Sequence, residues 1–341
     1  MLVDNRYSRQ ILFDPIGEKG QECIQNSHVL IIGVGALGSS SSEMLVRAGV
    51  GTITLMDRDY VEESNLQRQQ LFTEADVENK TPKVIAAKNR LQKINSQTKI
   101  DAQLTDAGVE ELEAIVPDVD VVIDATDNFD TRLIINDVCQ KYHTPWIYGA
   151  CVASYGVTFT VLPDETPCLQ CIMDHIPSDG ATCDTVGIIS PTVQKVVAHQ
   201  VTEVLKLLTG NTEALSGKLV AFDLWKNQQM ELEVASLKDD SCPSCVKKIY
   251  PNLDYQSQLK TAVLCGRNTV QIRAGKHRNF HFDDFKMHLK QTNLINYLEN
   301  PYLISFEINE FRVVVFHDGR TLIHGTKNIQ EAKKIYYRFV G

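Results

Sequence analysis

A glycine-rich loop is the first feature of the sequence that could do chemistry. Gly33, Gly35 and Gly38 form a GxGxxG pattern directly after the apolar run 28–33 and before a stretch with helical periodicity. Glycines at these positions let backbone N–H groups approach a phosphate, and the start of a helix adds partial positive charge. Asp57 ends the next apolar run, nineteen residues beyond Gly38, where a ribose-binding carboxylate is expected. The loop predicts a nucleotide site without distinguishing NAD from ATP.

The polar segment that follows this acid favours a ligand rich in phosphate. Residues 57–69 read DRDYVEESNLQRQ, and a Pro-Lys pair at 82–83 opens the next helical stretch. Guanidinium groups match phosphate oxygens and stabilise the charge that develops when a triphosphate is split, whereas a dehydrogenase needs no such loop. The candidate nucleotide-binding residues here are Asp57, Asp59, Ser64, Asn65, Arg68 and Lys83.

A second acidic loop follows a later apolar run. Residues 124–128 read DATDN, and ligands of open α/β sheets bind at the carboxyl ends of the strands. Asp127 could hold Mg²⁺, a hard cation that prefers carboxylate and phosphate oxygens. Asn128 and Arg132 stand beside it, where the next helix is expected to begin. We therefore expect all three residues at the nucleotide site.

The cysteines point to a metal. Cys168, Cys171, Cys242 and Cys245 form two C-x-x-C pairs, which together offer the four thiolates of a closed, structural zinc site. A redox role can be written for one such pair, but two pairs in one chain favour Zn²⁺. Cys183 lies apart from them in a polar loop, GATCDTVG, where nothing in the composition requires burial.

Composition narrows the class of protein. The chain has 341 residues, 43% hydrophobic and 23% charged, which permits a full-sized core and excludes collagen-like and disordered classes. Its net charge of −9 argues against a basic protein that binds nucleic acid. The first residues, MLVDNRYSRQ, lack the apolar segment of a signal peptide. We therefore expect a cytoplasmic protein that binds neither membrane nor nucleic acid.

Apolar runs alternate with helical segments over most of the chain. The expected strands are 28–33, 52–57, 99–104, 119–124 and 145–149, and the expected helices between them are 82–94, 107–115 and 128–142. Further strands at 155–162 and 218–223 flank a helix at 191–209. This alternation predicts an α/β fold with a Rossmann-like, mixed but mostly parallel sheet and flanking helices.

The charge changes near residue 250. Residues 250–341 carry 13 Lys and Arg against 8 Asp and Glu, whereas the residues before them are strongly acidic. We therefore predict two domains, 1–249 and a small basic α+β module at 250–341. The expected elements of the module are strands 302–308, 311–316 and 320–324 and helices 282–290 and 328–338. Its role is left open between docking an acidic partner and packing or dimer stabilisation.

Taken together, these motifs resemble those of the ThiF/MoeB/HesA family, bacterial relatives of the ubiquitin-activating enzymes. The resemblance runs from Arg6 to about Cys245. It depends on the order of its motifs, which are RYSRQ at 6–10, GVGALG, MDRDYVEESNLQRQ, TPK, DATDN, and two cysteine pairs bracketing TCD. The resemblance implies the fold expected above, with an N-terminal arm and the structural zinc site in residues 1–249.

The resemblance also implies a reaction. Such enzymes are nucleotidyltransferases that use ATP to adenylate the C-terminal Gly-Gly carboxylate of a ubiquitin-like sulfur carrier protein, for molybdopterin or thiamine synthesis. The carboxylate attacks the α-phosphate and pyrophosphate leaves, so positioning and charge neutralisation should dominate. By this mapping Asp57 holds the ribose and Asp127 holds Mg²⁺. The phosphates fall to Asn65, Arg68 and Lys83.

Partners follow from the same resemblance. Arg9 is expected to reach into the other subunit's site, which makes the protein a homodimer. Cys183 is either the thiol that accepts the activated carrier or a bystander. The module at 250–341 is too short for a typical rhodanese domain, so we expect a separate sulfur donor, a cysteine desulfurase or a rhodanese.

Two other functions compete with carrier adenylation. An NAD-dependent oxidoreductase is supported only by the glycine loop and Asp57. A non-catalytic carrier-binding scaffold would not need the set of phosphate-binding residues, which is present in full: Arg9, Asn65, Arg68, Lys83 and Asp127.

Overall fold

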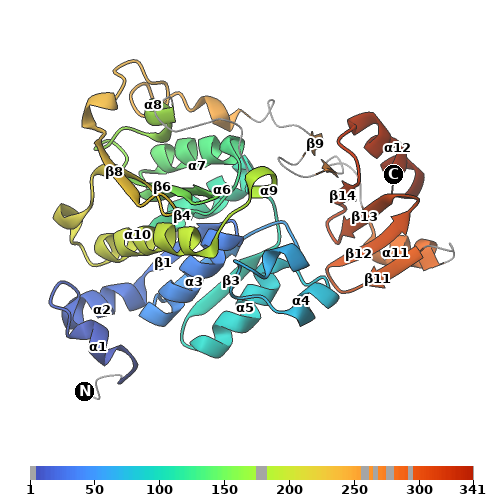
Figure 1. Ribbon diagram of the computed structural model, residues 1–341, viewed down its shortest axis with the longest axis horizontal. Coiled ribbons are helices and arrows are strands. Elements are labelled where there is room, and N and C mark those ends of the chain that lie inside the picture. The colour runs from blue at the N-terminus through green and yellow to red at the C-terminus, as the bar shows by residue number, and fades with distance from the viewer. Residues whose placement is uncertain are drawn as a thin grey trace. The chain divides into compact units, whose positions relative to one another are not determined.

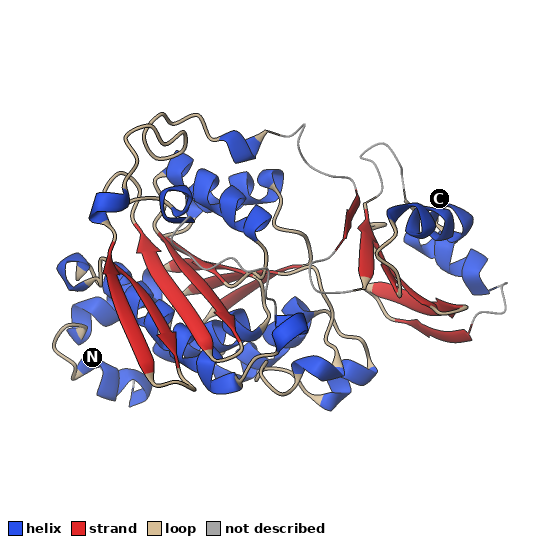
Figure 2. Cartoon of the chain, turned by 45° about the horizontal axis from the view of Figure 1, so that its top comes forward, coloured by secondary structure: helices blue, strands red, loops and turns tan. Residues whose placement is uncertain are grey.

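The structure is a computed structural model that describes residues 5–173, 183–254, 261–263, 268–273, 280–290 and 295–340. The chain divides into two compact units, Met1–Tyr255 and Gln256–Gly341, each with its own sheet (Figures 1 and 2). Cys265, Lys276, His277 and Arg278, which belong to the predicted basic module, lie outside the described residues. None of the helices described is both long enough and apolar enough to cross a membrane.

The first unit is built on an eight-stranded sheet with the order β3-β2-β1-β4-β5-β6-β7-β8. Its strands are β1 (His28–Ile32), β2 (Thr52–Met56), β3 (Lys99–Gln103), β4 (Val121–Asp124), β5 (Trp146–Val152), β6 (Tyr155–Val161), β7 (Lys218–Asp223) and β8 (Gln228–Glu233). Pairing is parallel from β3 to β5 and antiparallel from β5 to β8. The carboxyl ends of the parallel strands meet at one edge, here called the carboxyl edge.

Ten α-helices of the described chain belong to this unit. They are α1 (Ser8–Ile11), α2 (Gly17–Asn26), α3 (Ala36–Ala48), α4 (Glu74–Glu78), α5 (Lys83–Ile94), α6 (Val109–Ile115), α7 (Phe129–Tyr142), α8 (Leu169–Ile172), α9 (Cys183–Val186) and α10 (Ser190–Leu208). Alternate residues of β1 enter different cores: Val29 and Ile31 pack with α3, α5 and α10, and Leu30 and Ile32 pack with α6 and α7. A strand buried on both faces gives the continuous apolar run seen in the sequence.

The second unit is an antiparallel sheet with the order β11-β12-β13-β14-β10-β9. Its elements are β9 (Thr261–Val263), β10 (Thr269–Ile272), α11 (Phe282–Lys290), β11 (Ile295–Glu299), β12 (Leu303–Ile308), β13 (Phe311–Phe316), β14 (Thr321–His324) and α12 (Ile329–Phe339). One core joins both helices to the sheet, through Phe285 of α11, Tyr336 of α12, Phe306 of β12 and Val313 of β13. Both helices therefore cover the same face (Figure 2).

The predicted fold class is confirmed, and two of the elements that the sequence analysis missed, α2 and β8, have weak apolar patterns. In α2 a single large apolar side chain, Ile24, is buried. Strand β8 lies at the edge of its sheet, and nearly all its residues are exposed. Periodicity detects burial, so elements that bury little escape it.

Candidate functional site

The three glycines of the loop meet different surroundings at the carboxyl edge. Gly33 has φ +88°, and a Cβ there would lie 2.6 Å from the carbonyl oxygen of Ala125. At Gly38 a Cβ would lie 1.9 Å from the Gly33 oxygen, so these two glycines allow β1, β4 and α3 to approach closely. Beside Gly35 the nearest atom is Gln69 Nε2, 3.8 Å from the Cβ position. Of the three glycines, the middle one, where α3 begins, is therefore the one with room beside its Cα for a further atom.

Asp57 joins β2 to this loop. Its carboxylate accepts the Val34 N–H at 2.6 Å and the Asp59 N–H at 2.7 Å, one on each oxygen. Burial raises the pKa of Asp57 above its ordinary value, and the nearby Lys83 ammonium opposes that rise. Each carboxylate oxygen has a second lone pair, so Asp57 can bind ribose hydroxyls while it holds the loop.

Charged groups from three loops gather around Asp57. Lys83, the buried first residue of α5, places Nζ 3.5 Å from the Asp59 carboxylate. Arg58 pairs with Asp106 at 3.0 Å. Burial alone would lower the pKa of Arg58, but carboxylates including Asp59, Asp106 and Asp127 raise it. The carboxyl edge thus holds cations, among them Arg58 and Lys83, together with the acids that pair with them.

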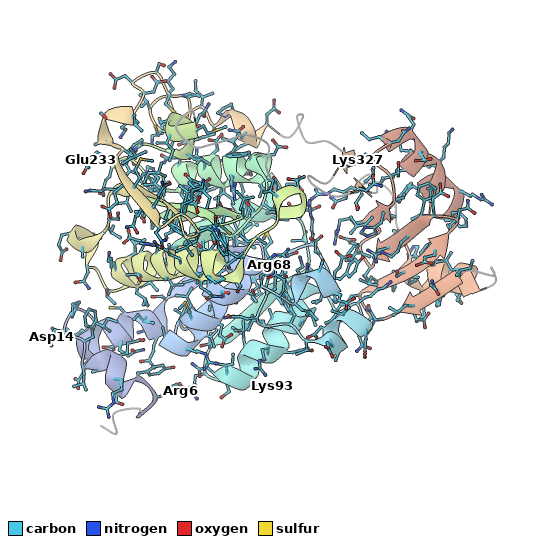
Figure 3. All side chains as sticks on the ribbon, viewed as in Figure 1. Arg6, Asp14, Arg68, Lys93, Glu233 and Lys327 are labelled. Carbon is cyan, nitrogen blue, oxygen red and sulfur yellow. The ribbon has the colours of Figure 1, made fainter. Side chains whose placement is uncertain are left out.

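The segment between β2 and α5 carries the other predicted phosphate ligands. Asn65 is buried, and its side-chain oxygen accepts the Glu62 N–H at 3.1 Å in a capping box. The Arg68 guanidinium donates to the Ser64 carbonyl oxygen at 2.7 Å, and Ser64 itself is exposed. Figure 3 labels Arg68. Both side chains are thereby given defined positions on a short loop.

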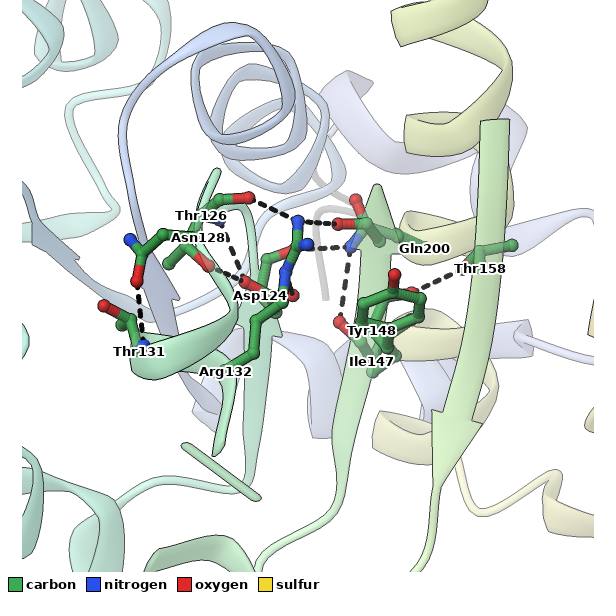
Figure 4. Close-up of polar contacts among 10 residues, drawn as sticks. Asp124, Thr126, Asn128, Thr131, Arg132, Ile147, Tyr148, Thr158 and Gln200 are labelled. Atoms are coloured by element: carbon green, nitrogen blue, oxygen red, sulfur yellow. Dashed lines mark hydrogen bonds and ion pairs between the residues drawn. The ribbon is translucent and has the colours of Figure 1, made fainter. Parts of the chain in front are cut away.

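A buried ion pair organises the DATDN loop (Figure 4). Arg132 Nε lies 3.0 Å from the carboxylate of Asp124, which has no exposed surface. The same guanidinium donates to the carbonyl oxygens of Thr126 at 2.6 Å and Gly149 at 3.2 Å. Asp124 also accepts the hydroxyl of Thr126 at 2.6 Å. Burial raises the pKa of Asp124, and its contacts with Arg132 and Thr126 oppose the rise.

This pair gives Arg132 a position that its spacing alone did not indicate. Its side-chain hydrogen bonds go to the loop, to β4 and to β5, and its guanidinium also lies over the ring of Phe129 in α7. Asn128 caps α7 by accepting the Thr131 N–H at 2.9 Å. Asp127, which precedes both of them, is exposed at the carboxyl edge. Of the three residues predicted from this loop, Asp127 is therefore the one that faces solvent.

Gln69 is a site residue that the sequence analysis passed over. Its side chain is 4% exposed, yet the buried Oε1 has no hydrogen-bond partner in the described chain. Its amide nitrogen borders the open space at Gly35. A buried polar atom without a partner costs about 1–3 kcal/mol, so the Gln69 amide, whose nitrogen lies beside Gly35 and whose oxygen is unpartnered, is a candidate ligand contact. This unpartnered oxygen can be recognised only in the structure and has no signal in the sequence.

The two C-x-x-C pairs converge in a cage formed by Cys168, Cys171, Cys242 and Cys245. Sγ–Sγ distances are 3.6 Å for Cys168–Cys242 and Cys171–Cys245 and 3.9 Å for Cys168–Cys171, and all four sulfurs lie within 4.8 Å of one another. Tetrahedral thiolates about 2.3 Å from Zn²⁺ would lie about 3.8 Å apart. The cysteine cage therefore fits zinc, with no open position for catalysis.

The N-terminal arm lies at the other end of the helices that start at the carboxyl edge. Gln10 donates to the Ala48 carbonyl oxygen at the end of α3, and Arg6 donates to that of Ile94 at the end of α5. Arg9, on α1, is exposed. Helices of this length span about 18–20 Å, so Arg9 cannot reach Gly35 of its own chain.

Residues 7–244 match the profile of the ThiF family. The chain belongs to this family. It is 52% identical to the sulfur carrier protein ThiS adenylyltransferase of Bacillus subtilis strain 168, over 99% of this chain and 100% of that protein. It is 36% identical to the molybdopterin-synthase adenylyltransferase of Escherichia coli K12, over 70% of this chain and 95% of that protein.

Solved structures support the fold of this ThiF-family chain. A crystal structure of E. coli MccB with ATP aligns with a TM-score of 0.61 at 24% identity, over 71% of this chain and 74% of that one.

In the ThiF-family chain Cys183 begins α9, and its side chain lies outside what the structure describes.

Replacing Arg132 by Met should destabilise the ThiF-family chain by about 3–5 kcal/mol, because Asp124 would remain buried without its cation. Urea unfolding monitored by far-UV circular dichroism measures the change. The double variant Asp124→Asn/Arg132→Met should recover part of the loss. A loss below about 1 kcal/mol would show that the pair does not organise this loop.

Proposed function

We propose that this chain is an ATP-dependent adenylyltransferase that activates the C-terminal carboxylate of a ThiS-like sulfur carrier as acyl-AMP and releases pyrophosphate. One observation carries the proposal. The chain is 52% identical to a ThiS adenylyltransferase over 99% of its length, whereas it is 36% identical to the molybdopterin-synthase relative, over 70% of its length. The carrier is therefore that of thiamine synthesis.

The reaction needs little proton transfer. A carboxylate oxygen of the carrier forms a bond to the α-phosphorus of ATP, the bond from that phosphorus to the bridging oxygen breaks, and pyrophosphate departs with the electron pair. Charge neutralisation and alignment should then supply most of the acceleration. Both demands match a glycine loop at a helix start surrounded by fixed cations.

Each nucleotide group has a candidate partner at the carboxyl edge. Asp57 binds the ribose, and the open space at Gly35 receives phosphate. Asn65, Arg68 and Lys83 bind the remaining phosphate oxygens. The support is positional: Lys83 is buried beside Asp59, and the backbone around Asn65 and Arg68 is held by their side chains.

Asp127 is the group that would hold Mg²⁺. An exposed carboxylate beside a phosphate site fits this ion, which keeps several waters and binds through one or two carboxylates plus substrate phosphates. Bound there with ATP, Mg²⁺ would offset phosphate charge. Arg132 then acts on Asp127 indirectly, because it fixes the loop from which that carboxylate projects.

The site is completed by a second copy of the chain. Arg9 is too far from its own carboxyl edge, and Leu12 and Phe13 beside it are 69% and 60% exposed. An exposed apolar pair next to an unused arginine is suited to contact with another subunit. The enzyme is accordingly a homodimer in which Arg9 serves the other subunit's ATP.

Sulfur chemistry is a later step with its own donor. The chain supplies the acyl-AMP, whose phosphate is a good leaving group, and a separate cysteine desulfurase or rhodanese supplies sulfur. Cys183 is the candidate thiol on this chain. Zinc in the cysteine cage is structural, since four protein thiolates leave no site for substrate.

The function is tested by incubating the protein with ATP, Mg²⁺ and either a ThiS-like or a MoaD-like carrier ending in Gly-Gly. Intact mass spectrometry should find an AMP adduct on the ThiS-like carrier. Asp127→Asn should lower the rate of pyrophosphate release at least tenfold. An adduct on the MoaD-like carrier alone would reassign the pathway, and no adduct on either would favour the scaffold function.

The role of Arg9 is tested by mixing inactive subunits. Arg9→Ala and Asp127→Asn should each abolish most activity, and their mixture should recover up to about a quarter of it, because half of randomly paired dimers hold one intact site. Pyrophosphate release after subunit exchange measures the recovery. If Arg9 served its own chain, the mixture would stay inactive.

Gln69 gives a prediction in which stability and binding change in opposite directions. Gln69→Leu should leave the free energy of unfolding unchanged or raise it by up to about 1 kcal/mol, because an unpaired polar group is removed. The KM for ATP should rise about tenfold in pyrophosphate exchange. Gly35→Ala, which fills the same space from the other side, should also raise KM. An unchanged KM with lower stability would make Gln69 a packing residue only.

A further inference from the structure

The middle of α7 contains a carboxylate for which the adenylation chemistry has no use. Asp137 is completely buried, and no described lysine or arginine lies within ion-pair distance of it. It accepts four hydrogen bonds: from Ser244 Oγ at 2.6 Å, Asn136 Nδ2 at 3.1 Å, and Asn252 N and Nδ2 at 2.9 and 2.8 Å. All four hydrogen bonds to this buried carboxylate come from neutral donors, and together they fix the side chain in place.

These hydrogen bonds lead to both halves of the cysteine cage. Ser244 stands between Cys242 and Cys245, and Asn252 belongs to the segment that follows them. The other half is reached through Asn136, whose side-chain oxygen accepts the Leu169 N–H at 2.8 Å, between Cys168 and Cys171. Neighbouring residues of one helix therefore contact two C-x-x-C turns that are 74 residues apart.

Ser244 also joins the turns to each other. Its Oγ lies 2.8 Å from the side-chain amide of Gln170, which is in the first turn. The atom of Gln170 at this distance is the side-chain oxygen Oε1, so the Ser244 hydroxyl has two acceptors, Gln170 Oε1 at 2.8 Å and Asp137 Oδ1 at 2.6 Å. Ser244 thus lies between the Asp137 carboxylate and the first C-x-x-C turn.

We propose that Asp137 is the positioning residue of the metal site: through Ser244 and its neighbour Asn136 it holds the two C-x-x-C turns at tetrahedral spacing. Mutation of residues that position the metal ligands without contacting the metal commonly lowers metal affinity 10–100-fold. The inference rests on hydrogen bonds and burial on this chain and does not depend on the adenylation activity. It also connects the cage to α7, the helix that carries Arg132.

Zinc transfer from the full-length, zinc-loaded protein to a chromophoric chelator tests the proposal. Asp137→Asn should raise the zinc dissociation constant 10–100-fold, because the side-chain nitrogen that replaces one carboxylate oxygen would face either the donors of Ser244 and Asn136 or those of Asn252. Substituted Co²⁺ should show a distorted tetrahedral absorption spectrum in this variant. Ser244→Ala should weaken zinc in the same direction by less, and the double variant should be no weaker than Asp137→Asn.

Two controls separate positioning from general loss of stability. Val138→Ala creates a cavity at the next residue of α7 without touching the hydrogen bonds, and Asp239→Asn removes an exposed carboxylate near Cys242. Both should keep zinc within about threefold of wild type. Equal weakening in Val138→Ala, or unchanged affinity in Asp137→Asn, would overturn the proposal. If Asp137→Asn does not fold, the zinc affinities of Ser244→Ala and Val138→Ala are compared instead. Weaker zinc binding in Ser244→Ala than in Val138→Ala supports the proposal, and equal affinities contradict it.

Discussion

A carboxylate that water cannot reach determines how the carboxyl edge is built. Asp124 ends β4 with no exposed surface, so it must be neutralised inside the protein, and Arg132 from the next helix does so. The fork of the guanidinium then has donors left for Thr126 and Gly149. One electrostatic requirement thereby joins β4, β5, α7 and the loop between them. The exposed Asp127 takes its position from that assembly.

Burial also explains what the sequence could predict. Strands such as β1 are buried on both faces and leave continuous apolar runs, and α10 shows its buried stripe at helical spacing. The GxGxxG loop and the C-x-x-C pairs were found because their chemistry requires fixed local spacing. Local signals of this kind located both the nucleotide edge and the cysteine cage.

Properties that depend on distant partners were not predictable. The spacing of Arg132 placed it at the site, but its contacts to Asp124 and Gly149 arise only when β4 and β5 pair. In the sequence Gln69 is one polar residue in a polar loop, and only the structure shows that its buried Oε1 has no hydrogen-bond partner among the described residues. Asp137 likewise has no signature in the sequence, because three of its four hydrogen bonds come from a segment more than a hundred residues away.

The cysteine cage also changes the topology of the unfolded chain. Its turns follow β6 and β8, and 74 residues separate Cys168 from Cys242. A crosslink that closes a loop of this size removes about 4 kcal/mol of conformational entropy from the unfolded state by the chain-entropy estimate. The closed segment includes α10, β7 and β8, of which β7 and β8 pair with each other, whereas α10 packs on α3, β5 and β6 outside it. A bound metal would therefore hold this segment as a closed loop even in the unfolded chain, and so favour the folded state of the unit.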